Sequence, residues 1–211
     1  LPNGDLIAGG SFTIAGGVNA SRIARWDGSA WSALGSGTDF SVFALAALPN
    51  GEIVAGGEFF SAGGVAASRV AQWNGSSWSA LSTGVNASVS DLAVLPGGDL
   101  IVGGTFATAG GVSAKGIARW DGVSFSALGS GLEGQAPRVF GMTVLANGDL
   151  VAGGWFSSAG GQAAINIARW DGASWSALGT GVDGSVNALA VLRSGDLVAG
   201  GTFVTVGGMV A

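Results

Sequence analysis

The chain has 211 residues, of which 48% are apolar and only 10% are charged, and its formal net charge is −5 with a single lysine, Lys115. Nucleic-acid binding depends on clustered lysine and arginine, so this composition disfavours a nucleic-acid partner. Without cysteine there is no disulfide, thiolate nucleophile or thiolate metal site. Gly, Ser and Asp interrupt every apolar segment, so we expect no membrane insertion.

One sequence template recurs along the whole chain. The segment Leu-Pro-Asn-Gly-Asp-Leu begins at residue 1, and related segments begin at 48, 95, 145 and 192, so the offsets are 47, 47, 50 and 47 residues. The motif Arg-Trp-Asp-Gly, or Gln-Trp-Asn-Gly in the second copy, keeps the same register. We therefore expect a single repeat array over 1–211. Its repeats are 1–47, 48–94, 95–144, 145–191 and a partial 192–211.

Each repeat predicts four antiparallel strands. In the second copy, the expected strands are 42–48, 52–59, 68–73 and one that begins at Trp78, with a loop at Ala62-Gly63-Gly64-Val65. Asn50-Gly51 supplies the positive φ of a hairpin turn. Gly56-Gly57 inside a strand indicates close approach of another backbone. A period of about 47 residues with four strands is typical of a propeller blade, so the predicted fold class is an all-β propeller.

The order of these elements resembles a WD-repeat blade, from the apolar strand through the Asn-Gly turn to the strand that ends in Trp-Asp. The chain contains no histidine, so the Gly-His dipeptide of WD repeats is missing. The combination of Gly-Gly-x-Phe, Ala-Gly-Gly and Ile-Ala-Arg-Trp-Asp-Gly resembles kelch-like repeats of secreted bacterial proteins and fungal cortical polarity markers more closely. These resemblances imply a propeller used for binding or display, with no shared catalytic residue.

The sequence begins at the second strand of a blade and stops after the second strand of its fifth repeat. The expected groups are thus three strands, three sets of four, and two. We expect a section of a larger ring or of an oligomer-completed one, whose open edges pair with flanking repeats or with a second copy of the chain.

No catalytic site is predicted. The lack of His, Cys and Tyr removes most nucleophile–base pairs. The carboxylates recur at turn positions of every repeat, which indicates a structural role. One carboxylate per blade is too sparse for Ca²⁺, so we predict no metal and no cofactor.

An aromatic pair recurs in each repeat. Its second member is Trp31, Trp78, Phe125 or Trp175. The replacement of Trp by Phe125 favours space filling, although stacked tryptophans also form sugar-binding platforms. We predict buried structural roles for the first members, which are Trp26, Trp73, Trp120 and Trp170.

Trp155 departs from its repeat counterparts Ser11, Glu58, Thr105 and Thr202, so we expect it to be exposed and to contact a ligand. The loops after the fourth strands carry one acid or amide at a common position, and the third loop holds the three-residue insertion. These loops and the Ala-Gly-Gly loops are expected on one face. The predicted ligand- or partner-binding residues are Asp39, Asn86, Glu133, Arg138, Trp155 and Asp183.

The sequence therefore predicts a non-enzymatic binding or scaffold propeller, with a protein or glycan partner. The alternative is a lectin-like propeller with one shallow sugar site per blade, and a propeller-type enzyme ranks last. The charge-poor, Gly/Ser/Ala/Thr-rich surface favours an extracellular or cell-surface location. Three Asn-x-Ser triplets, at Asn19, Asn74 and Asn86, match the N-glycosylation pattern.

Overall fold

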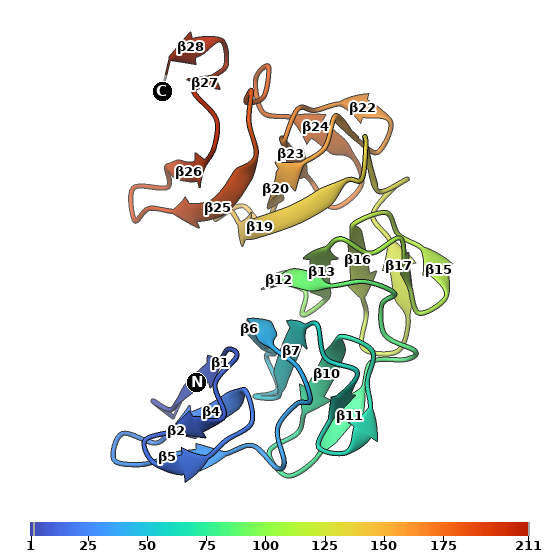
Figure 1. Ribbon diagram of the computed structural model, residues 1–211. Coiled ribbons are helices and arrows are strands. Elements are labelled where there is room, and N and C mark those ends of the chain that lie inside the picture. Colours follow the sequence, from blue (N-terminus) through green and yellow to red (C-terminus); the bar gives the residue numbers. More distant parts are fainter. Residues whose placement is uncertain (2, 211) are drawn as a thin grey trace.

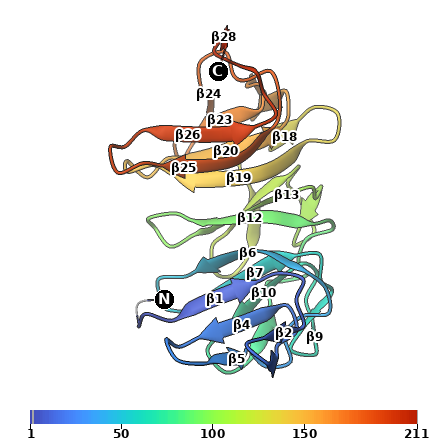
Figure 2. The same ribbon diagram turned by 60° about the vertical axis from the view of Figure 1, so that its left-hand side comes forward.

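The computed structural model describes residue 1 and residues 3–210, and across them the backbone forms strands, turns and bends without a helix. The long strands form five antiparallel sheets of three, four, four, four and two strands, in the expected order. The sheets stand side by side in an open arc (Figure 1). Figure 2 shows them stacked from β1 at one end to β26 at the other. The predicted all-β propeller architecture is confirmed. The single domain over 1–211 stays a prediction.

We number these sheets blades 1 to 5 along the chain. The first strands of blades 2 to 5 line the concave side of the arc and are β6 (Val42–Ala47), β12 (Val89–Val94), β19 (Arg138–Val144) and β25 (Val186–Val191). The second strands are β1 (Leu6–Gly9), β7 (Ile53–Gly57), β13 (Leu100–Gly104), β20 (Leu150–Trp155) and β26 (Leu197–Gly201). The third strands are β4 (Ile23–Trp26), β10 (Val70–Trp73), β16 (Ile117–Trp120) and β23 (Ile167–Trp170). The outermost strands are β5 (Trp31–Ala33), β11 (Trp78–Ala80), β17 (Phe125–Ala127) and β24 (Trp175–Ala177).

The segment expected as an Ala-Gly-Gly loop is in fact a short hairpin of two-residue strands, so that expectation was wrong in every repeat. Gly63 and Gly64 form its turn at φ values of 60° and 80°, which glycine adopts without strain. The hairpins are β2–β3 (Ile14–Ala15, Val18–Asn19), β8–β9 (Ser61–Ala62, Val65–Ala66), β14–β15 (Thr108–Ala109, Val112–Ser113), β21–β22 (Ser158–Ala159, Gln162–Ala163) and β27–β28 (Thr205–Val206, Met209–Val210). In addition, β18 (Leu132–Glu133) pairs with β21.

The core lies between neighbouring blades. The phenylalanine of each Gly-Gly-x-Phe motif is buried in the middle blades, with Phe59 and Phe106 0% and 1% exposed. The first strand of blade 2 is apolar along its whole length. Phe43 in β6 is nevertheless 53% exposed, because this strand lies on the concave side of the arc.

A cross-strand ion pair recurs within the blades. Arg25, Arg119 and Arg169 bind the carboxylates of Asp5, Asp99 and Asp149 at 2.5, 2.7 and 2.6 Å. In blade 2, Gln72 replaces the arginine and Glu52 replaces the aspartate, and Gln72 donates a hydrogen bond to Glu52. The repeated turn carboxylates therefore have a structural role within their own blade.

Candidate functional site

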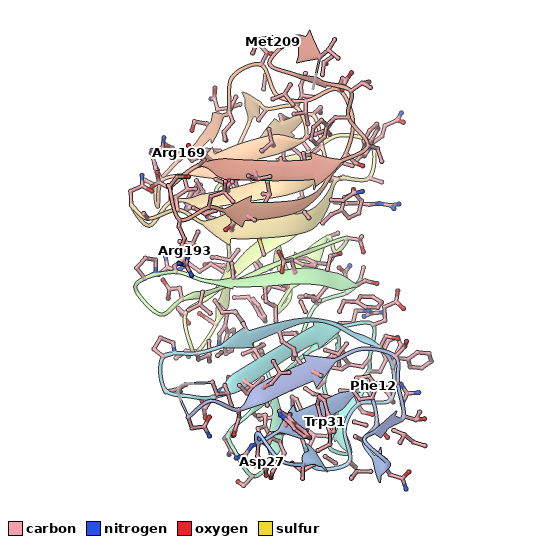
Figure 3. The ribbon with its side chains drawn as sticks, turned by 90° about the vertical axis from the view of Figure 1, so that its left-hand side faces the viewer. Phe12, Asp27, Trp31, Arg169, Arg193 and Met209 are labelled. Carbon is pink, nitrogen blue, oxygen red and sulfur yellow. The ribbon has the colours of Figure 1, made fainter. Side chains whose placement is uncertain are left out.

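The short hairpins and the loops after the outer strands meet at the same end of the strands. Isolated backbone bridges join Thr38 to Ala62, Val85 to Ala109, and Val182 to Val206. Each bridge connects the loop of one blade to the hairpin of the next, so both kinds of loop share one face, as predicted. We call this face the hairpin end. Figure 3 labels Phe12 there, and Arg169 and Arg193 at the opposite end.

Three predicted contact residues form hydrogen bonds between neighbouring blades at the hairpin end. They connect blades 1 and 2, blades 2 and 3, and blades 4 and 5. The Oδ1 atom of Asp39 accepts hydrogen bonds from the N–H groups of Phe60 and Ser61 at 2.8 and 3.0 Å. Asn86 and Asp183 repeat this arrangement with the following hairpins. In each loop a single side-chain oxygen accepts both hydrogen bonds. Asp and Asn both provide such an oxygen, which explains why they interchange at this position. The N–H groups of Thr205 and Val204 lower the pKa of Asp183 below its ordinary value.

The third loop of this kind along the chain differs because of its insertion. Glu133 lies in β18, where its backbone oxygen accepts from Ser157 N–H at 2.8 Å and its Oε2 accepts from Ser158 Oγ at 2.9 Å. Ala136 follows at φ 53°. The other non-glycine residues with positive φ, Arg22, Arg69, Ser82 and Asn166, stand at positions shared by the repeats. Ala136 stands outside the repeat, so its strained backbone belongs to the insertion itself.

Arg138 and Trp155 are cross-strand partners at the hairpin end of blade 4. The same position holds a serine and a small or polar residue in other blades, as in Ser88 with Thr105. In blade 4 the ladder between the first and second strands extends to this pair, whereas in blade 3 it ends at Val89 and Gly104. Trp155 is 49% exposed, so its predicted exposure is confirmed, while its role in binding stays a prediction.

These two side chains line a cavity of about 300 Å³ at the boundary of blades 4 and 5. Its other lining residues are Gln135, Ala136, Phe140 and Ser185. The structure thus brings Arg138 and Trp155 together and leaves Asp39, Asn86, Glu133 and Asp183 outside this cavity. Sequence reasoning missed Phe140 and Ser185. Phe140 shares its repeat position with Phe43, so it resembled a core residue.

The predicted burial of the first tryptophan of each pair is correct for Trp120, which is 8% exposed, and wrong for Trp26, Trp73 and Trp170, which are half-buried. In blades 2 to 4 the second member is the more deeply buried, and Trp78 and Trp175 insert toward the preceding blade, whereas Trp31 in blade 1 is half-buried like Trp26. The Nε1 atoms of Trp78 and Trp175 donate to the carbonyls of Leu34 and Leu128 at 2.8 and 2.9 Å. The two rings of each pair lie 4.8 to 5.5 Å apart at tilted angles, which fits packing within the blade.

Among the described residues, three or more His, Cys, Asp or Glu side chains nowhere gather closely enough to hold a metal ion. Over the same residues there is no helix of the length and apolar character that a membrane crossing requires.

Comparison with known proteins gives the same fold. A family model described as a β-propeller domain of unknown function (DUF5122) matches residues 1–26, 48–75 and 145–170. The WD40 β-propeller domain of Doa1 superposes with a TM-score of 0.53 at 16% identity, over 85% of this chain and 54% of that one. PorZ, a surface component of the type-IX secretion system of Porphyromonas gingivalis, gives 0.52 at 15% identity, over 84% and 28%. No curated protein matches in sequence.

The chain therefore consists of β-propeller repeats related in structure to WD-type blades. It spans about half of the Doa1 propeller chain and under a third of the PorZ chain. At these identities the comparisons establish the fold, and the site must be argued from its own residues.

Proposed function

We propose that the chain is a non-enzymatic binding or scaffold module and that it binds a protein partner at the cavity lined by Arg138, Phe140 and Trp155. The observation that carries the proposal is that several departures from the repeat pattern lie together at one cavity. The insertion, the strained Ala136 and the two unusual side chains of the Arg138–Trp155 pair all depart from the repeat, and all meet at one cavity. Departures that served only the fold would have no reason to meet at one place.

The physical character of this cavity suits protein recognition. Trp and Arg are the residue types that most often dominate the energy of a protein interface. Phe140 adds a second aromatic wall, and about 300 Å³ is room for one or two side chains of a partner. Glu133 and Asp183 support the proposal indirectly, because they anchor the two loops that contribute Gln135, Ala136 and Ser185 to the cavity. Asp39 and Asn86 form the corresponding hydrogen bonds between earlier blades.

The lectin alternative has one specific observation in its favour. A groove of about 600 Å³ runs beside Trp170 and Trp175, and Gln162, Ser174 and Ser176 give it a polar lining. Trp175 is largely buried there and its indole N–H is already hydrogen-bonded to Leu128, so only Trp170 could offer a face to a sugar ring.

An extracellular or cell-surface location is part of the proposal. It is supported by the small number of charged residues and the Gly/Ser-rich composition. Among the structural neighbours, PorZ is a bacterial surface component, which is in keeping with such a location.

Selection of a phage-displayed random peptide library against the intact chain tests the binding site. We expect selected peptides to lose binding at least 10-fold on Trp155→Thr, a residue that Thr105 and Thr202 show this position accepts. Phe40→Ser is the matched control, since Phe40 is another exposed aromatic outside this cavity and 55% exposed. A parallel glycan-array screen that finds sugars bound at Trp170, with no selected peptide sensitive to Trp155→Thr, would favour the lectin.

A further inference from the structure

The chemistry of the Arg138–Trp155 cavity also specifies the kind of peptide that it takes. We infer that the cavity recognises an acidic peptide segment, in which a carboxylate binds the guanidinium of Arg138 and a neighbouring apolar side chain packs against Trp155 and Phe140. This inference rests on the proposed function, and it names the ligand class of the same site.

Five other arginines of the chain bind partners within the protein. Arg25, Arg119 and Arg169 are ion-paired with aspartates of their own blades. Arg22 and Arg69 donate to the carbonyls of Thr38 and Val85 at 2.9 and 3.1 Å. Arg138 differs from these five. Among the described arginines it shares its lack of an ion pair or a side-chain hydrogen bond only with Arg193, which lies in a turn at the opposite end of the strands (Figure 3). Within the described residues no carboxylate lies at ion-pair distance from it, although 13 acidic residues are present in the sequence.

The acidic residue nearest to Arg138 along the chain is Glu133. Glu133 is five residues away in the same loop, yet it lies on the other side of that loop. Its carboxylate accepts from Ser158 Oγ, and it lines a separate cavity of about 350 Å³ together with Gly134 and Pro137. The insertion thus separates the charges of Glu133 and Arg138 and leaves Arg138 as the only ionisable side chain among the lining residues of the Arg138–Trp155 cavity.

The hydrogen-bond donors of the cavity match a carboxylate ligand. A guanidinium binds a carboxylate through two parallel N–H···O bonds, and such charge-assisted bonds are about twice as strong as neutral ones. Gln135 is an exposed second donor at the rim. Ser185 Oγ is already engaged with Asn187 and Thr202. Arg138 and Gln135 therefore suffice for one carboxylate, whereas a bound sugar would bury several hydroxyls without partners.

The aromatic side chains of the cavity match an apolar part of the ligand. Trp155 is about half exposed, Phe140 is partly covered, and both line the cavity beside Arg138. An aromatic surface next to a cation suits an apolar residue that adjoins Asp or Glu in an extended peptide. Ala136, at φ 53°, is the residue next to Gln135 and lines the cavity with it.

The repeats supply variants that keep the fold. Arg138→Ser copies Ser41, Ser88 and Ser185, which occupy the same position in other blades. Peptides from the library selection are synthesised in two forms, with their Asp and Glu residues retained or changed to Asn and Gln. Binding of both forms to the wild-type chain and to Arg138→Ser is measured by fluorescence anisotropy, and circular dichroism confirms that each variant folds.

We expect acidic residues to be enriched in the selected peptides. The change to amides and the change Arg138→Ser should each weaken binding about 10- to 100-fold, and together little more than either alone. Peptides that depend on Trp155 but are indifferent to both changes would overturn this inference and leave the proposed function standing. Absence of any peptide that depends on Trp155 would overturn the proposed function as well. Binding of acidic sugars instead, lost on Arg138→Ser, would replace the peptide by a glycan.

Discussion

Gly103 in blade 3 and Val139 in blade 4 meet so closely that a methyl group on Gly103 would lie 2.7 Å from Val139 Cγ1. Equivalent contacts join Gly9 to Val42, Gly56 to Val89 and Gly153 to Val186. This glycine of each second strand therefore sets the spacing between blades.

Gly103→Ala should destabilise the fold. The added methyl group would press on Val139 and Met142 in a packed interface, and overpacking of this kind costs about 1–3 kcal/mol. Urea unfolding measures the change. Gly97→Ala is the matched control, because a Cβ there would meet nothing within 4 Å, and we expect it to change stability by less than about 0.5 kcal/mol. Equal effects of the two variants would contradict the role given to the interface glycine.

The two tryptophans of one blade should differ in their importance for stability. Trp78 is 5% exposed and donates to Leu34 of the preceding blade, so Trp78→Ala should cost about 3–5 kcal/mol of unfolding free energy. Trp73 is half-buried, so Trp73→Ala should lower the unfolding free energy by a smaller amount. Thermal unfolding of both variants, with the exposed Trp155→Thr as a reference, makes the comparison. A larger loss for Trp73→Ala would restore the assignment made from sequence.

The turn aspartates should make the fold sensitive to acid. Hydrogen bonds from Ala30 N–H and from the hydroxyl and N–H of Ser29 lower the pKa of Asp27 from its ordinary 3.8 to about 2. The folded state thus favours the ionised form, and this contribution is present above about pH 4 and is lost as the pH falls toward 2. Asp121 and Asp171 have lowered pKa values for the same reason.

Asn74 forms the same turn in blade 2 without a charge, which provides the test. Changing all three aspartates, Asp27, Asp121 and Asp171, to asparagine should flatten the fall in melting temperature between pH 4 and pH 2. Little change is expected at pH 7. If the melting temperature of the triple variant falls as steeply below pH 4 as that of the wild type, the acid sensitivity comes from other groups.

Asp91 should make the stability of the fold depend on pH in the opposite direction. Its burial raises the pKa of the carboxyl, although hydrogen bonds from Met142 N–H at 2.5 Å and Leu92 N–H oppose the rise. The folded state thus favours the protonated form, so stability should fall as the pH rises from about 3.8 through the raised pKa. Asp91→Asn keeps an acceptor for Met142 and should remove this fall. Melting temperatures between pH 3 and pH 8 would show it, and parallel curves for both proteins would contradict it.

The repeat spacing predicted the sheets because each strand is bounded by turn glycines whose positions recur. The short hairpins were missed since two-residue strands carry no alternation. The order of burial within the Trp73–Trp78 pair could not be predicted either, because it depends on how the preceding blade approaches the outer strand. At the site, the sequence singled out Arg138 and Trp155 separately. Their direct pairing across β19 and β20 follows from a register that the three-residue insertion conceals.

The interchange of Ser88–Thr105 with Arg138–Trp155 at one cross-strand position has an evolutionary consequence. The position lies outside the packed core, so it can mutate freely while the glycines and tryptophans preserve the scaffold. Any blade could then acquire a recognition surface through two substitutions and a lengthened loop. Duplication of repeats would multiply such places without disturbing folding, and a designer could transplant the pair into blade 3 by the same route.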